Sequence, residues 1–259
     1  MRGWAGMVIG ALLALTAPAA VHAQAAAFSD WAAVVVAGDW RAHGGGPTEA
    51  FDNARRDVAA ALVELGFPKA QIRQYSVRPG RYRDTRPEKS DLPTIDAGLS
   101  DLARAAPGGC LVYLTSHGAP EGAVVDETLL TPGRLADMVD GACPNRPSIV
   151  VLSACFSGVF VPTLQQRDRM ILTAARHDRT SFGCGESDKY PFFDDCFLKA
   201  APAAHDFAAL GGAVQACVAA TEKATGASPP SEPQLWIGGR LKPLLPLYAF
   251  ARPPPRQRP

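Results

Sequence analysis

The sequence has almost no excess charge, no cluster of basic residues and few histidines. Its 259 residues include 26 Lys and Arg against 25 Asp and Glu, and the basic residues are scattered along the chain. Without a basic patch, neither nucleic acid nor an anionic membrane surface is an expected partner. Only five histidines occur, and no two cysteines have C-x-x-C spacing, so no metal site is expected.

Several motifs of nucleotide-binding proteins and serine enzymes are also missing. The glycine-rich stretch "HGGGP" at 43–47 has neither the phosphate-loop nor the dinucleotide pattern, so no nucleotide cofactor is expected. The stretch "FSGVF" at 156–160 is not a G-x-S-x-G nucleophile elbow. A serine hydrolase is therefore disfavoured.

The apolar run near the N-terminus is too short to span a bilayer comfortably. It follows Arg2 and contains Gly10 and Pro18. A charged start, a short apolar core and the small-residue site "VHA" at 21–23 predict a secretory signal peptide over residues 1–23. The mature protein is expected to be periplasmic or secreted, with no stable membrane anchor after cleavage.

Six cysteines in an exported protein permit three disulfides, or two disulfides if Cys155 stays free. Cys184 and Cys196 flank an acidic, aromatic stretch and would close a short ring. A bridge across a loop of that size stabilises a fold by up to about 3 kcal/mol in the chain-entropy model. Two further pairings stay open: Cys110–Cys143 and Cys143–Cys217.

Apolar runs typical of buried strands alternate with amphipathic segments typical of helices. Strands are predicted within 31–40, 71–77, 110–118, 148–158, 167–175 and 231–239, helices within 48–67, 92–106, 131–142 and 206–224, and polar loops over 78–91 and 182–196. This alternation predicts right-handed crossovers and a mainly parallel sheet with helices on both faces. In such sheets the ligand crevice lies outside the carboxyl ends of the strands.

Two of the predicted strands end in a reactive side chain surrounded by small residues. "CLVYLTSHG" delivers His117, and "SIVVLSACFSG" delivers Cys155. If these strands adjoin, the imidazole can take the proton of the thiol, and the thiolate can attack a carbonyl. The backbone amides of Gly118 and Cys155 are then the candidate oxyanion hole. The plainer alternative is a small core cysteine and a loop histidine.

The motifs "YLTSHG" and "VVLSACFSG" resemble those of the legumain-like cysteine peptidases of the caspase–hemoglobinase group, in their bacterial exported form. "VAGDW", "RTSFGCGES" and "SEPQLWIG" resemble further segments of that family more weakly. The resemblance implies a three-layer caspase-like α/β fold over residues 28–250, a His117–Cys155 dyad, an acyl-enzyme intermediate and a peptide or protein substrate. The Pro- and Arg-rich tail, residues 251–259, is expected to be disordered.

The same resemblance implies a pocket for the substrate side chain. Its candidate residues are Arg41, Thr180, Ser181, Asp194 and Asp195. Legumains carry a glutamate directly after the catalytic cysteine, where this chain has Phe156, so specificity for asparagine is not implied. Asn53 is the candidate for orienting the histidine, and the charged helix residues 52–57 are expected to form a solvated face.

Three functions are compatible with these observations. The favoured one is a cysteine-type endopeptidase that uses the Cys155–His117 dyad. A catalytically silent protein of the same fold could instead hold peptides in the crevice, with an unreactive or disulfide-bonded Cys155. A transpeptidase would use the same dyad and resolve the acyl-enzyme with an amine rather than with water.

Overall fold

The computed structural model describes residue 1 and residues 27–251. All but the first residue of the expected signal peptide (1–23), and all but the first residue of the expected tail (251–259), lie outside the described residues. A sheet of seven strands, in the order β10-β9-β8-β4-β1-β2-β3, forms the centre of the molecule. Its strands are β1 (Trp31–Ala37), β2 (Ile72–Ser76), β3 (Glu88–Lys89), β4 (Gly109–Thr115), β8 (Ser148–Ser153), β9 (Arg169–Thr173) and β10 (Gln234–Ile237).

All neighbouring strands in this sheet are parallel except β10, which runs antiparallel to β9. The central strands are continuous apolar runs because both of their faces are covered. Val35, Tyr113 and Val151 pack into the core on one face, while Val34 and Val112 pack on the other. The predicted mainly parallel sheet is therefore confirmed.

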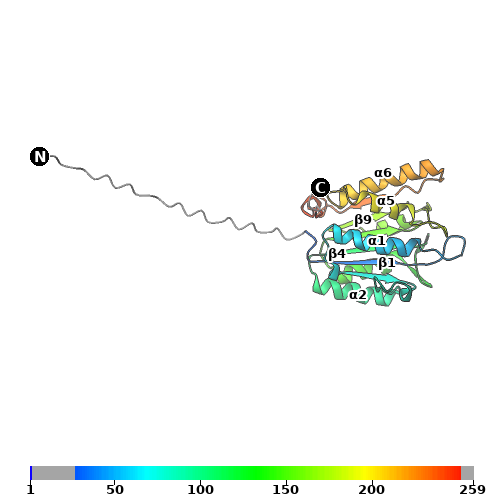
Figure 1. Cartoon of the computed structure of the whole chain (residues 1–259), viewed down its shortest axis with the longest axis horizontal. Helices are drawn as coiled ribbons and strands as arrows, with labels where there is room; N and C mark the ends of the chain where they lie inside the picture. The colour runs from blue at the N-terminus through cyan, green and yellow to red at the C-terminus, as the bar shows by residue number, and fades with distance from the viewer. Residues whose placement is uncertain (2–26, 252–259) are drawn as a thin grey trace.

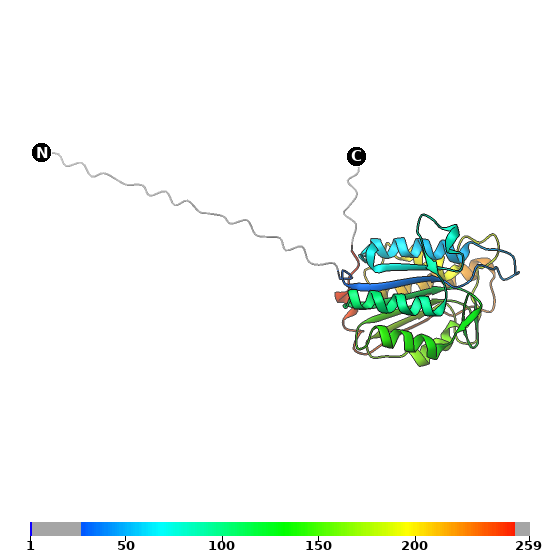
Figure 2. The ribbon, with the colours of Figure 1, turned by 90° about the horizontal axis from the view of Figure 1, so that it is seen from below.

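Helices cover the two faces in separate layers (Figures 1 and 2). One layer contains α1 (Ala50–Glu64), α5 (Phe192–Ala200) and α6 (Phe207–Thr225). The other contains α2 (Leu92–Ala105), α3 (Pro132–Ala142) and α4 (Val161–Leu164). Short 3₁₀ segments occur at Lys69–Gln71, Pro79–Arg81, Ser157–Phe160 and Leu245–Leu247. None of the helices within residues 27–251 is long and apolar enough to cross a membrane.

Two features of the fold differ from the sequence-based expectation. A small antiparallel sheet follows β4, made of β5 (Gly118–Ala119), β6 (Gly122–Val125) and β7 (Thr128–Leu130). The segment 182–196, expected to be a polar loop, contains the first turns of α5. Phe193 and Phe197 of α5 are fully buried in the core, and this burial stabilises a helix whose preceding residues are polar.

The structure decides between the disulfide pairings that the sequence left open. Cys196 of α5 pairs with Cys217 of α6, so Cys196 does not close a ring with Cys184. The other bridge is Cys110–Cys143, one of the two pairings that the sequence left open. Cys155 and Cys184 are free. The two bridges tie helices to each other or to the sheet and leave the thiol at the strand end available.

Candidate active site

His117 and Cys155 follow the carboxyl ends of two neighbouring parallel strands. Thr115 of β4 is in register with Ser153 of β8, and each reactive residue lies two positions beyond its strand end. The backbone N–H of Ser116 donates to the Ser153 carbonyl at 3.0 Å, which extends the pairing past the strands. The structure therefore brings the two side chains to the same edge of the sheet.

The imidazole of His117 is oriented by a backbone carbonyl. Its Nε2 lies 2.8 Å from the carbonyl oxygen of Arg41, in the loop after β1. A carbonyl oxygen only accepts hydrogen bonds, so Nε2 carries the proton in this contact. In the neutral ring Nδ1 is then the nitrogen that can accept a proton. The ring edge also packs against Phe51 of α1, with the centroids 5.0 Å apart.

Cys155 is half-buried and contacts the segment that follows β9. Its Sγ accepts a hydrogen bond from the backbone N–H of Ser181 at 3.2 Å, and the Ser181 hydroxyl lies 3.6 Å away. The backbone N–H of Cys155 has no acceptor among the described residues. Phe156, directly after it, has a φ of +57°, a left-handed conformation that is unusual for a bulky residue. The chain thus turns sharply immediately behind the thiol.

Two loops meet beside these residues. The hydroxyl of Thr48 donates to the Gly185 carbonyl at 3.0 Å, and the backbone N–H of His43 donates to the Cys184 carbonyl at 3.2 Å. Burial, and to a smaller extent the nearby Cys155, raise the pKa of the Cys184 thiol to about 11. The glycine-rich loop after β1 and the loop before α5 therefore contact each other and together form one side of the candidate active site.

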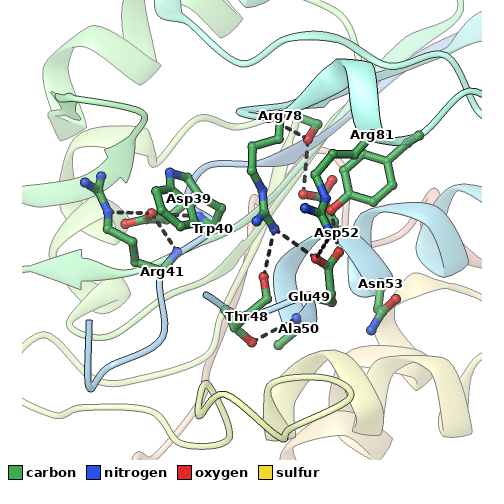
Figure 3. Close-up of polar contacts among 12 residues, drawn as sticks. Asp39, Trp40, Arg41, Thr48, Glu49, Ala50, Asp52, Asn53, Arg78 and Arg81 are labelled. Atoms are coloured by element: carbon green, nitrogen blue, oxygen red, sulfur yellow. Dashed lines mark hydrogen bonds and ion pairs between the residues drawn. The ribbon is translucent and has the colours of Figure 1, made fainter. Parts of the chain in front are cut away.

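Arg41 forms ion pairs with two carboxylates, and Figure 3 shows its contact with Asp39. Its Nε lies 3.1 Å from Asp39 Oδ1, and its Nη1 lies 3.3 Å from Glu127 Oε1. Asp39 is the main cause of a raised pKa for the Arg41 guanidinium. About a third of the side chain is exposed, so Arg41 contributes its carbonyl to His117 and a charged group to the surface nearby.

Of the charged residues at 52–57, Asp52 and Arg55 do not lie on a solvated face, which corrects that expectation for these two, whereas Arg56 and Asp57 are partly exposed. Asp52 and Arg55 form a fully buried ion pair at 2.8 Å, and Ser76 of β2 donates to the second carboxylate oxygen at 3.1 Å. Glu49 contacts Arg78 and Arg81 from the loop after β2 (Figure 3). These polar contacts anchor the start of α1, which carries Phe51 against His117.

Asn53 does not orient the histidine, because its amide donates to the Lys189 carbonyl at 3.2 Å. The orienting group is a backbone oxygen, whose role no residue type reveals. Of the other candidates, Ser181 lies against Cys155, and Thr180 is exposed. Asp195 is partly exposed and pairs with Lys199 on the same helix.

Asp194 has no exposed surface, so it does not line a substrate pocket as expected. Its Oδ2 accepts hydrogen bonds from Thr115 Oγ1 at 2.9 Å and Ser153 Oγ at 2.7 Å, and its Oδ1 accepts from the Tyr113 hydroxyl. Burial raises the pKa of this carboxyl to about 6, although the three hydroxyl donors oppose the shift. The carboxylate lies directly beneath the two strand ends.

Within residues 27–251 no three His, Cys, Asp or Glu side chains are arranged to hold a metal ion. The chemistry that this arrangement offers is that of a thiol, an imidazole and backbone donors at one sheet edge. Residues 103–223 match the model of the peptidase C13 family. Over this segment the chain is similar to the C13, or legumain, peptidases. The matched segment contains both strand ends and α5, and the match supports a cysteine peptidase in general.

The fold is caspase-like. Caspase-1 from the moth Spodoptera frugiperda superimposes with a TM-score of 0.58 at 15% sequence identity, over 81% of this chain and 88% of that chain. At this identity the likeness concerns the fold alone. No curated protein matches the sequence.

Proposed function

We propose that this protein is an exported cysteine endopeptidase with a single peptidase domain over residues 28–250. Cys155 is the nucleophile, and His117 is the general base and then the general acid. The observation that carries the proposal is their placement after β4 and β8, two neighbouring parallel strands. The 2.8 Å contact from the Arg41 carbonyl to Nε2 supports the role of His117, because it leaves Nδ1 as the basic nitrogen.

In the proposed reaction Nδ1 of His117 takes the proton of the Cys155 thiol, and the sulfur attacks the carbonyl carbon of the peptide. The C–N bond breaks, and the imidazolium gives its proton to the departing amine. Water then attacks the thioester with His117 again as the base, which releases the acid and restores the thiol. The backbone amides of Gly118 and Cys155 stabilise the oxyanion, and losing one such donor typically slows a reaction about 10²–10³-fold.

The substrate is a peptide or protein whose side chain lies near Arg41 and Ser181. Both residues are tied to the proposed dyad, Arg41 through its carbonyl and Ser181 through its amide. A periplasmic or secreted location is supported by the two disulfides, which persist in oxidising compartments.

The experiment that tests the proposal is cleavage of a proteome-derived peptide library by the purified protein. We expect the wild type and His205→Ala to cleave the same bonds, because His205 is exposed on the loop before α6. Cys155→Ala and His117→Ala should be inactive. Cleavage that is unchanged in Cys155→Ala would reject the proposal, and peptide binding without cleavage by the wild type would favour the scaffold. Ligated peptides in the presence of added amines would indicate a transpeptidase.

A further inference from the structure

The carboxylate of Asp194 is a buried ionisable group that the proposed mechanism does not use. It is wholly buried in the first turn of α5, and its three hydrogen-bond donors are the neutral hydroxyls of Tyr113, Thr115 and Ser153. A buried carboxylate without a cation is costly even when it is hydrogen-bonded. The amino end of the helix offsets part of this cost, since the helix dipole favours negative charge there. Stability alone does not explain why a charge lies at this position.

Its hydrogen bonds join the two strands that carry the proposed dyad. One oxygen, Oδ2, accepts from both Thr115 of β4 and Ser153 of β8, at 2.9 and 2.7 Å. These two residues are register partners across the sheet. A single acceptor atom therefore fixes the spacing of the two strand ends, while Oδ1 accepts from the Tyr113 hydroxyl one turn of the pleat earlier.

The hydrogen bonds of Asp194 to Tyr113, Thr115 and Ser153, called the clamp below, lie on the same face of the sheet as the reactive side chains. Alternate residues of a strand point to the same face. The side chain of His117 therefore lies on the same face as that of Thr115, and the side chain of Cys155 on the same face as that of Ser153. The contact between Phe51 of α1 and the His117 ring agrees with this, because α1 and α5 cover the same face. Between the clamp and the thiol–imidazole pair, each strand end contributes a single further residue.

We propose that Asp194 is a positioning residue that holds His117 and Cys155 at their reactive separation, an inference that rests on the proposed function. It touches neither substrate nor reacting atoms. The ionised carboxylate accepts all three hydroxyl hydrogens, whereas a protonated one donates its own hydrogen, so that one of the three hydroxyls must turn from donor to acceptor or lose its contact. The clamp is therefore complete only when Asp194 is ionised.

Asp194 is ionised above a pH of about 6, since burial raises its pKa to about 6. Among neighbouring titratable groups, Tyr113 and Asp195 have the largest effects on this pKa. Burial and the adjacent carboxylate raise the pKa of Tyr113 well above the ordinary value, so Tyr113 remains a donor. Asp195 pairs with Lys199 and stays at the surface. The clamp consequently weakens as the pH falls below about 6.

The test compares Asp194→Asn with the wild type on the best-cleaved library peptide between pH 4.5 and 8. Asn keeps the shape of Asp but is permanently neutral. We expect kcat to fall roughly 10- to 100-fold at pH 7.5 with an unchanged KM, as for a small misplacement of reacting groups. The ratio of the two kcat values should then shrink below about pH 6, where wild-type Asp194 becomes neutral. Asp137→Asn, an exposed substitution on α3, is the control and should match the wild type.

Two further variants separate positioning from folding. Thr115→Val keeps the shape of the side chain but removes one donor and should lower kcat, while Thr115→Ser restores the hydroxyl and should recover most of the rate. Three results would overturn the inference: an unchanged kcat in Asp194→Asn, a fall in kcat that is equal at every pH, or a rise in KM without a fall in kcat.

If the wild type cleaves no peptide, the readout becomes alkylation of Cys155 by iodoacetamide with peptide mapping. Alkylation that depends on His117 but is identical in Asp194→Asn would refute the clamp and leave the dyad intact. Alkylation that does not depend on His117 would refute the proposed function itself. A His117-dependent rate that falls in Asp194→Asn only above about pH 6 would support both.

Discussion

The carbonyl oxygen of Cys155 occupies the space that a β-carbon on Gly118 would take. The two atoms would lie only 2.0 Å apart, which no real contact of this kind shows. A residue other than glycine at this position must therefore move the segment after β4 away from the segment after β8. These are the segments whose relative placement defines the proposed active site.

Gly118→Ala should lower kcat/KM by at least about 10²-fold, because it displaces both the proposed oxyanion donors and His117. The activity assay and the melting temperature are measured together. Gly212→Ala is the matched control, since a β-carbon there meets nothing within 4 Å and alanine favours the helix. Full activity in Gly118→Ala would show that the close approach of the two segments is unimportant.

The burial of Asp194 predicts an unusual dependence of stability on pH. Its pKa is raised to about 6, so the folded chain binds this proton more tightly than the unfolded chain does. Asp194 therefore stabilises the fold as the pH falls from about 6 toward 4, and it destabilises the fold above about 6. In Asp194→Asn this dependence is absent.

Urea unfolding of the wild type and Asp194→Asn at several pH values measures the effect. The difference in their free energies of unfolding should change by up to about 3 kcal/mol between pH 4 and pH 7, in favour of the variant at the higher pH. A difference that is constant over this range would mean that Asp194 has an ordinary pKa.

The two disulfides should have different effects on activity. Removing either one lowers stability by about 3–4 kcal/mol in the chain-entropy model, given sequence separations of 33 and 21 residues. Cys196–Cys217 joins α5, which carries Asp194, to α6, whereas Cys110–Cys143 lies at the opposite end of β4 from His117. Replacing Cys196 and Cys217 by alanine should lower kcat even at temperatures at which the variant is still folded.

Replacing Cys110 and Cys143 by alanine should leave kcat unchanged under the same conditions. The comparison is made by measuring kcat at a temperature at which both double variants are folded. Circular dichroism checks that they are folded. Equal kcat losses in the two variants would indicate that α5 has no special link to the active site.

The sequence predicted the elements whose patterns are local. The apolar runs of β1, β4 and β8 are continuous because both faces of the sheet are covered, and that pattern identifies buried parallel strands without further information. The placement of His117 and Cys155 at one edge followed from the parallel order of their strands. The fold likeness agrees with the predicted mainly parallel sheet.

Features that depend on contacts between distant residues were not predictable in the same way. The pairing of Cys196 with Cys217 depends on how α5 packs on α6, and cysteine spacing alone left the connectivity open. The buried Asp52–Arg55 pair has the sequence pattern of an exposed helix face. The partner of the imidazole, the Arg41 carbonyl, belongs to the backbone, so no residue type could mark it.

The most direct test of the account is whether the reactivity of Cys155 depends on His117. Iodoacetamide is added at pH 6, where an ordinary thiol with a pKa of about 8.5 is almost wholly protonated, and the modified residues are mapped. Cys184 is an internal reference, since its pKa of about 11 makes it a slow thiol. We predict fast alkylation of Cys155 in the wild type and in His205→Ala, and slow alkylation in His117→Ala. Equal rates for Cys155 with and without the imidazole would contradict the account.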